Sequence, residues 1–192
     1  MNSTTENAHI PTKEKLIVAG INILQEHGLQ GFSLRKIASA CNISCAAPYK
    51  HFRDKDDLIK SIVDYINEQW HKRQVKIIEK HAPDTRKQLI EISLEYIRFL
   101  VENPHFRSVI MIKDSRIQNI YNQYNISTLS KQLIQEYCTK QQMPKEREFV
   151  KTFIVLSLIH GAAMMFANGE IEYNDKNFLL ISQAIEREFD LA

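Results

Sequence analysis

Apolar residues recur at intervals of three and four along most of the chain, which is the spacing of one face of an α-helix. The first such segment begins at Thr12 and runs to about His27, and Gly28 follows it as a stop. The spacing predicts further helices over about 54–81, 84–103, 104–113, 116–140, 153–167 and 175–189. These segments together predict an all-α protein.

Residues 33–55 are predicted to hold two short helices and the start of a third. Ser33, Ser44 and Asp54 each offer a side-chain oxygen that can cap the helix that follows. Between the first two helices, Asn42 is the residue best able to adopt the left-handed conformation that ends a helix. The side chains expected to point inward are Leu34, Ile37, Ala38, Cys41, Ile43, either Ala47 or Pro48, and Phe52. This arrangement predicts a helix-turn-helix over residues 33–52.

The outward side chains of this segment can donate hydrogen bonds to phosphate oxygens. They are Arg35, Lys36, Ser44, Tyr49, Lys50, His51 and Lys55. An ordinary solvated surface would carry the same residue types. The charge distribution favours a DNA-binding surface instead, because residues 33–55 hold five cations and one carboxylate, whereas residues 85–192 hold 13 of each.

Together these residues resemble the DNA-binding domain of the TetR family of bacterial transcription regulators. The resemblance covers about residues 11–65 and rests on FSLRKIA at 32–38, NIS at 42–44, YKHF at 49–52 and KDDL at 55–58. It implies a three-helix DNA-binding domain at 11–58 after a disordered arm at 1–10. A long helix would join it to a C-terminal ligand-binding and dimerisation domain at 59–192.

The candidate DNA-binding site is drawn from the helix-turn-helix and the residue that begins the long helix. Its members are Ser33, Arg35, Lys36, Ser44, Cys45, Ala46, Ala47, Tyr49, Lys50, His51 and Lys55. The small side chains at 45–47 can touch thymine methyl groups. The resemblance implies that Arg35 reaches a base edge and that Lys55 binds phosphate. Pro48 departs from the family's commoner residues, and we expect it to disturb only the first turn of the second helix.

Residues 153–167 are apolar on almost every face of the predicted helix. With 15 residues the stretch is short for a membrane span, so we expect protein to cover it on all sides. One side can meet its own domain and the other a second subunit. Together with the helix at 175–189, two copies would form a four-helix bundle, which also resembles the family's dimer interface.

A small-molecule effector is the partner that the resemblance implies for the C-terminal domain. The candidate ligand-binding residues are Tyr96, Phe99 and His160. An ordinary core would use the same residue types, and for His160 a buried, hydrogen-bonded core position is the preferred interpretation.

Other chemistry receives little support from the sequence. The seven histidines show no metal-ligand spacing, and we find no Gly-rich phosphate loop or nucleophile elbow. We therefore predict no metal, no cofactor and no enzymatic activity. Cys41 and Cys45 are separated by the turn, so two structural thiols are preferred over a redox switch.

The sequence thus predicts a ligand-responsive repressor that binds a palindromic operator in double-stranded DNA as a homodimer. An all-helical enzyme or protein-interaction module with a basic partner-binding head is the alternative. The odd number of cysteines and the polar residues 1–9 favour a reduced, cytoplasmic and nucleoid-associated protein without a membrane partner.

Overall fold

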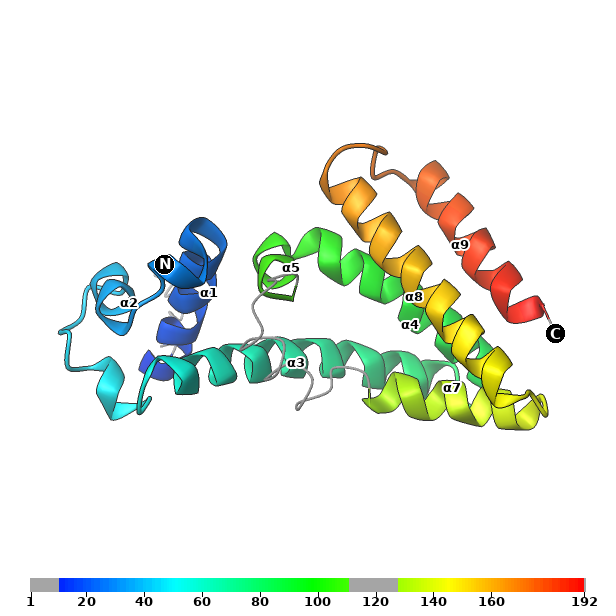
Figure 1. Cartoon of the computed structure of the whole chain (residues 1–192), viewed down its shortest axis with the longest axis horizontal. Coiled ribbons are helices and arrows are strands. Elements are labelled where there is room, and N and C mark those ends of the chain that lie inside the picture. Colours follow the sequence, from blue (N-terminus) through cyan, green and yellow to red (C-terminus); the bar gives the residue numbers. More distant parts are fainter. Residues whose placement is uncertain (1–10, 111–127, 192) are drawn as a thin grey trace, which may run out of the picture. The chain divides into compact units, whose positions relative to one another are not determined.

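The computed structural model describes residues 11–110 and 128–191, and all regular structure within them is helical (Figure 1). The elements are α1 (Thr12–Gly31), α2 (Leu34–Ala40), the 3₁₀-helix η1 (Pro48–Lys50), α3 (Lys55–Lys80), α4 (Thr85–Glu102), α5 (Pro104–Ile110), α7 (Thr128–Lys140), α8 (Lys145–Ala167) and α9 (Asp175–Asp190). The predicted all-α class is confirmed. The predicted arm at 1–10 and the part of the predicted helix 116–140 that precedes residue 128 lie outside the described residues.

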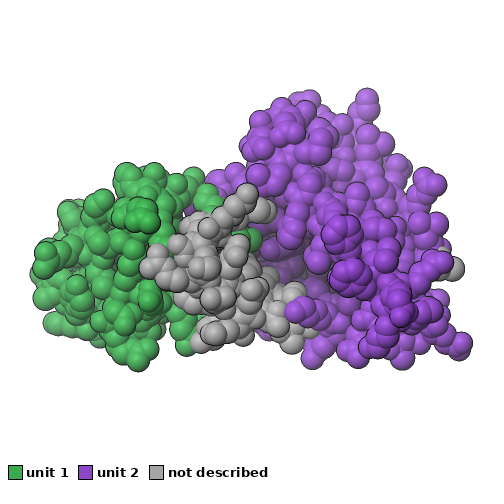
Figure 2. All heavy atoms as spheres, viewed as in Figure 1, with its two compact units in different colours: residues 1–65, 108–124 green, residues 66–107, 125–192 purple. Residues whose placement is uncertain are grey.

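The chain divides into two compact units, which Figure 2 shows in different colours. The first unit comprises residues 1–65 and 108–124, and the second comprises residues 66–107 and 125–192. Helix α3 contributes to both, because the division falls between Tyr65 and Ile66. The functional domain limits expected from the sequence, 11–58 and 59–192, stay a prediction.

Helix α1 is interrupted one turn before its end. Gly28 has φ 59° and ψ −170°, a conformation that glycine adopts without the strain of a side chain, and the helix resumes for one turn to Gly31. We expected α1 to end at Gly28, so the break is where it was predicted but the extra turn was not. Side chains from α1, α2 and the start of α3 form the buried core of this unit. They include Leu16, Ile21, Ile37, Ala38, Leu58 and Ile62.

The caps predicted at Ser33 and Asp54 form, whereas η1 has no side-chain cap, so the cap predicted at Ser44 does not form; Asp84 also caps its helix. Ser33 Oγ accepts a hydrogen bond from the amide of Lys36 at 3.3 Å. The carboxylate of Asp54 accepts one from the amide of Asp57 at 2.9 Å, and that of Asp84 does the same for α4. These bonds satisfy amides that the first turn of a helix leaves unpaired.

Helix α4 lies at the centre of the second unit, where it packs against α7, α8 and α9. Its buried side chains occupy more than one face, so several neighbours are needed to cover them. They are Thr85, Gln88, Leu89, Ile90, Ile92, Ser93, Leu94, Ile97, Phe99 and Leu100.

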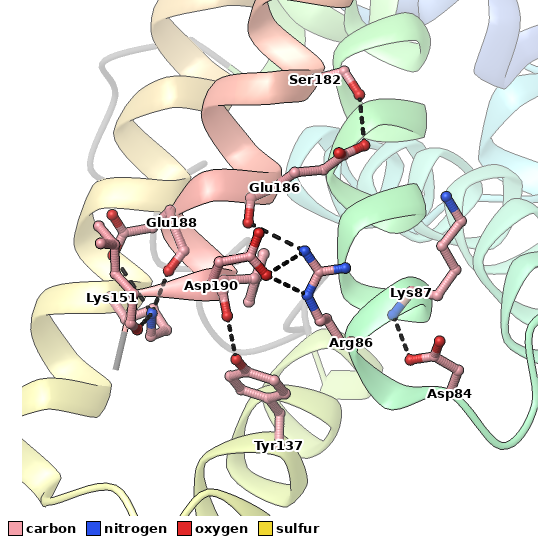
Figure 3. A network of polar contacts seen from close by, with 11 residues as sticks. Asp84, Arg86, Lys87, Tyr137, Lys151, Ser182, Glu186, Glu188 and Asp190 are labelled. Carbon is pink, nitrogen blue, oxygen red and sulfur yellow. Dashed lines mark hydrogen bonds and ion pairs between the residues drawn. The ribbon is translucent and has the colours of Figure 1, made fainter.

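The C-terminal turn of α9 is held by a buried lysine from α8. Lys151 is only 3% exposed, and its ammonium donates hydrogen bonds to the carbonyl oxygens of Glu188 and Leu191 (Figure 3). The Glu188 carboxylate lies 3.6 Å from the same ammonium. The last carbonyls of a helix lack intrahelical partners and carry its negative dipole end, so a cation is well placed here.

Two further donors hold the same turn (Figure 3). The hydroxyl of Tyr137 on α7 donates to the carbonyl of Phe189, and burial raises the pKa of this hydroxyl, which keeps its proton in place. Arg86 on α4 donates to the Glu186 carbonyl at 3.4 Å and, through Nε, to the Asp190 carboxylate at 2.9 Å. Side chains from three helices therefore fix where α9 ends.

Helix α8 is covered on one side only. It has 23 residues rather than the expected 15, because residues 145–152, most of which are polar, also belong to it. Val155, Ile159 and Ala163 are buried, whereas Phe149 is 71% and Phe153 63% exposed. The expectation that protein covers the apolar stretch on every side is therefore not met within a single chain.

Helix α8 is also the one helix, among the described residues, that is long and apolar enough to cross a membrane. Its mean hydropathy reaches 1.8, and 33% of that window is buried inside the protein. Length and composition alone are weak evidence for a span, since core helices meet the same criteria.

Replacing Lys151 with Met tests the anchor of α9. The Met side chain keeps the apolar stem but removes the ammonium, which leaves the carbonyls of Glu188 and Leu191 unpaired. We expect the free energy of unfolding in urea to fall by about 1.5–3 kcal/mol, the usual contribution of hydrogen bonds to a charged group. Lys145→Met, at an exposed position of the same helix, is the matched control and should change little. Equal stability of the two variants would contradict the anchoring role.

Candidate DNA-binding site

The segment between α2 and α3 contains successive tight turns rather than the regular second helix that we expected. The amide of Ala47 donates to the carbonyl of Ser44 at 2.9 Å, that of Lys50 to Ala47 at 3.2 Å and that of His51 to Pro48 at 2.9 Å. Pro48 has no amide proton, and its ring crowds the carbonyl four residues earlier. The prediction that Pro48 disturbs only the first turn is therefore wrong, because the regular structure is reduced to η1.

Buried side chains nevertheless fix this segment to the first unit. Pro48 is buried, not Ala47, and Phe52 is only 2% exposed. Asn42 has φ 54°, so the predicted left-handed turn after α2 is confirmed. Cys41 and Ile43 are half-buried rather than fully inward. The turn is thus rigidly supported although its helix is short.

The candidate DNA-binding side chains differ in exposure. Arg35, Lys36, Ser44, Cys45, Ala46, Tyr49, Lys50 and His51 are exposed, and Ser33, Ala47 and Lys55 are half-buried. Tyr49 presents 55% of its surface to solvent. All of them belong to the first unit, on α2, on the turn or at the start of α3.

Lys55 has a structural role that the sequence did not indicate. Its ammonium donates a hydrogen bond to the carbonyl of Leu29 at 2.8 Å and lies 5.7 Å from the ring centroid of Phe32. Leu29 follows the break at Gly28, so this bond ties the last turn of α1 to the first turn of α3. The two partners are 26 residues apart, and no periodicity in the sequence connects them.

Arg53 is partly neutralised by the cap of α3. The Asp57 carboxylate accepts a hydrogen bond from the Arg53 amide at 3.0 Å and lies 3.7 Å from its guanidinium Nε. The backbone hydrogen bond from Arg53 is the main reason that the pKa of Asp57 is lowered. Arg53 therefore contributes less to the basic surface than its formal charge suggests.

The two nearby cysteines differ in environment. The Cys41 thiol donates to the carbonyl of Lys15 at 3.6 Å, and burial raises its pKa, so the unreactive thiol form is favoured. Cys45 is exposed on the turn. Among residues 11–110 and 128–191, no group of three or more His, Cys, Asp or Glu side chains could hold a metal ion.

The candidate effector residues lie around one aromatic cluster of the second unit. The ring centroid of Trp70 lies 4.7 Å from that of Tyr96 and 5.5 Å from that of Phe99. Tyr96 is 6.3 Å from His160 and Phe99 is 5.7 Å from Phe106. Phe99 is only 1% exposed, whereas His160 is exposed. The preferred interpretation of His160 as a buried core residue is therefore wrong for the single chain.

Comparison with known proteins agrees with this architecture. Residues 16–62 match the family model of bacterial regulatory proteins of the tetR family. Over 155 residues the chain is 26% identical to the nucleoid occlusion factor SlmA of Escherichia coli. This match covers 76% of this chain and 77% of SlmA. A match of 25% identity to an HTH-type transcriptional regulator of Saccharopolyspora erythraea covers 48% of this chain and 37% of that protein.

Solved structures share the fold over most of the chain. A TetR family transcription regulator from Marinobacter aquaeolei has a TM-score of 0.73 at 16% identity, covering 92% of this chain and 94% of that one. The transcriptional regulator FadR from Bacillus subtilis, solved in complex with stearoyl-CoA, has a TM-score of 0.71 at 16% identity, covering 92% and 96%.

A helix-turn-helix on an all-helical body defines this protein as a DNA-binding transcriptional regulator. The match at residues 16–62 and the shared fold also indicate which class of regulators the protein resembles. Residues 16–62 are similar to the DNA-binding domain of the tetR family of bacterial regulatory proteins, and most of the chain shares the fold of solved TetR family regulators.

Two substitutions test the structural role of Lys55 and the predicted base contact of Arg35. We expect Lys55→Met to lower the free energy of unfolding by about 1.5–3 kcal/mol and to weaken operator and random DNA alike. Arg35→Ala, on exposed surface, should leave stability unchanged and cost about 1–3 kcal/mol of binding, chiefly on the preferred operator. Affinities at several salt concentrations decide the role of Lys55. If Lys55→Met lowers the salt slope by about one for each lost contact, Lys55 binds phosphate as well.

Proposed function

We propose that this protein is a ligand-responsive repressor that binds a palindromic operator as a homodimer. The observation that carries the proposal is the presence, in one chain, of a tetR-type DNA-binding domain and an uncovered apolar face on α8 and α9. On this proposal the protein acts in the cytoplasm on chromosomal DNA and is not an enzyme.

DNA recognition would use the turn and the exposed end of α2. Cys45 and Ala46 are small and exposed, so the backbone can approach base edges closely and meet thymine methyl groups. Arg35 can offer two donors to a guanine, while Lys36 and Lys50 can bind the flanking phosphates. Because η1 is a single turn, the set of base contacts from this segment is expected to be short.

The homodimer would form through α8 and α9, which run side by side in Figure 1. Their outward apolar side chains have no cover in the single chain. They include Phe149, Val150, Phe153 and Leu156 on α8 and Leu179 and Leu180 on α9. An exposed apolar patch of this kind marks an interaction surface. A two-fold axis lets the same patch cover itself, and two helices from each chain then form a bundle.

Gly161 supports a second copy as the occupant of this face. It is exposed on α8, and a Cβ atom added there would meet nothing within 4 Å in its own chain. Glycine inside a helix costs about 1 kcal/mol relative to alanine, so its presence needs a reason. Ser157 is exposed one turn earlier. Small residues at this spacing allow another helix backbone to approach closely, as at the crossing of two copies of α8.

Charges introduced on the outward face of α8 and α9 test the dimer. Phe153→Glu and Leu180→Glu should leave the helical circular dichroism unchanged and convert a dimer to monomers in sedimentation velocity, because each would bury a carboxylate in the interface. Ala163 and Ile185 are unsuitable positions, since both are fully buried in their own chain. Val18→Glu, at an exposed apolar position of α1, is the control. A folded Phe153→Glu variant that still sediments as a dimer would place the interface elsewhere.

The effector would bind at the aromatic cluster around Trp70, Tyr96 and Phe99, near His160. Aromatic rings with a few polar groups are the usual lining of sites for small apolar or amphipathic ligands. FadR of Bacillus subtilis, which shares the fold, was solved with stearoyl-CoA, a ligand with a long apolar chain. An effector releases the operator only if it binds the DNA-free conformation more tightly than the DNA-bound one.

Linkage gives a reciprocal test of this coupling. A preference of about 1–3 kcal/mol for the DNA-free conformation lowers operator affinity roughly 5–150-fold, and operator must then weaken ligand binding by the same factor. Stearoyl-CoA is the first ligand to titrate by calorimetry, with and without saturating operator DNA. Binding of unchanged affinity in the two titrations would rule out the coupling for that ligand.

A further inference from the structure

One buried polar atom near the aromatic cluster has no hydrogen-bond partner among the described residues. Oδ1 of Asn67, on α3 in the second unit, is buried and makes no hydrogen bond within the part of the chain that the structure describes. Leaving a buried acceptor unpaired costs free energy, and most such groups in native proteins are satisfied. An unpaired acceptor at this position therefore needs an explanation.

Asn67 lies on the same face of α3 as the cluster. Residues three and four positions apart on a helix are neighbours, so Asn67 is adjacent to Trp70, whose ring lies 4.7 Å from that of Tyr96. One turn further along this face, the side chain of Gln74 is 1% exposed and donates to Ser130 Oγ at 2.8 Å. The described part of the chain thus supplies a partner for the buried amide of Gln74 and none for the acceptor of Asn67.

We propose that Asn67 Oδ1 accepts a hydrogen bond from the effector. The effector would then carry a neutral hydroxyl or N–H group attached to an apolar body, and that body would contact Trp70 and Tyr96. This inference rests on the proposed function, because it uses the aromatic cluster as the effector site. It also narrows the ligand class: an ionised carboxylate has no proton to donate, so the head group of a free fatty acid does not fit Asn67, whereas a primary alcohol or amide does.

The donor should decide selectivity between otherwise matched ligands. A ligand with the donor pairs the buried acceptor, while an analogue without it leaves that acceptor unpaired in a site from which water is now excluded. We expect the first to bind roughly 5–100-fold more tightly.

A pair of ligands that differ in the donor, with a methyl group in place of the hydroxyl proton, tests the proposal. 1-Decanol has a hydroxyl proton, and 1-methoxydecane has the same chain without one. Trp70 is the single tryptophan of the sequence, so intrinsic fluorescence reports on this cluster directly. The wild-type protein should bind the alcohol at least about fivefold more tightly than the ether. Asn67→Leu, which keeps the size and removes the acceptor, should abolish the preference and bind the ether no more weakly.

Two further variants keep the test decisive. Asn67→Ala removes the acceptor with a smaller side chain and serves if the Leu variant folds poorly. Asn22→Leu, at an exposed asparagine of α1, is the matched control and should retain the preference. Without ligand, Asn67→Leu should melt no lower than the wild type, because it removes an unpaired acceptor.

The outcomes distinguish this inference from the function on which it rests. If neither ligand binds near Trp70, the effector site at this cluster and the role of Asn67 both fail. If both ligands bind the wild type equally, the effector site stands and the role of Asn67 is wrong. A preference for the ether would contradict the proposal, because the hydroxyl proton would then have no acceptor in the site. A preference for the alcohol that survives in Asn67→Leu would place the acceptor elsewhere and contradict the role of Asn67.

Discussion

The second unit depends on the burial of α4. This helix is apolar on several faces, so α7, α8 and α9 must all pack against it, and each uses one face to do so. The opposite faces of α8 and α9 are then left in solvent with Phe153 and Leu180 exposed. The same packing places Tyr96 and Phe99 against Trp70 of α3. The proposed dimer surface and the proposed effector site are therefore both consequences of covering one central helix.

In the first unit, side-chain hydrogen bonds at helix ends stabilise helices that are too short to be stable alone. Ser33 and Asp54 cap α2 and α3, and Lys55 joins α3 to the turn after Gly28. Such bonds fix the turn while leaving its outer surface free of packing, which is what a surface that contacts DNA requires. A further contact at the start of α3 reduces the positive charge of this surface. Arg53 is paired with Asp57, so the basic surface depends more on Arg35, Lys36 and Lys50 than the formal charges imply.

The sequence predicted the features that local chemistry decides. The limits of α3, α4 and α9, the caps at Ser33 and Asp54 and the left-handed Asn42 follow from residue types at short spacing. The errors arose where a choice depends on distant residues. Hydrophobic periodicity does not show which face of an all-apolar helix is covered, so the exposure of His160 was missed. The bond between Lys55 and Leu29 was missed because its partners are 26 residues apart. Pro48 is a local error of another kind, because a proline without an amide proton in so short a segment left only the single turn of η1.

Within the second unit the proposed effector site and the proposed dimer surface meet at one residue. His160 lies on the exposed face of α8, and its ring is 6.3 Å from that of Tyr96, which contacts Trp70. A ligand that moves Tyr96 would therefore disturb a side chain on the helix of the proposed interface through a single ring contact. Two sites are coupled when they share a structural element that has two arrangements and when occupation of either site favours one of them. Here α8 contributes to both proposed sites. On this view, the proposed effector needs no long pathway to alter how two copies of the chain would be held together in the proposed dimer.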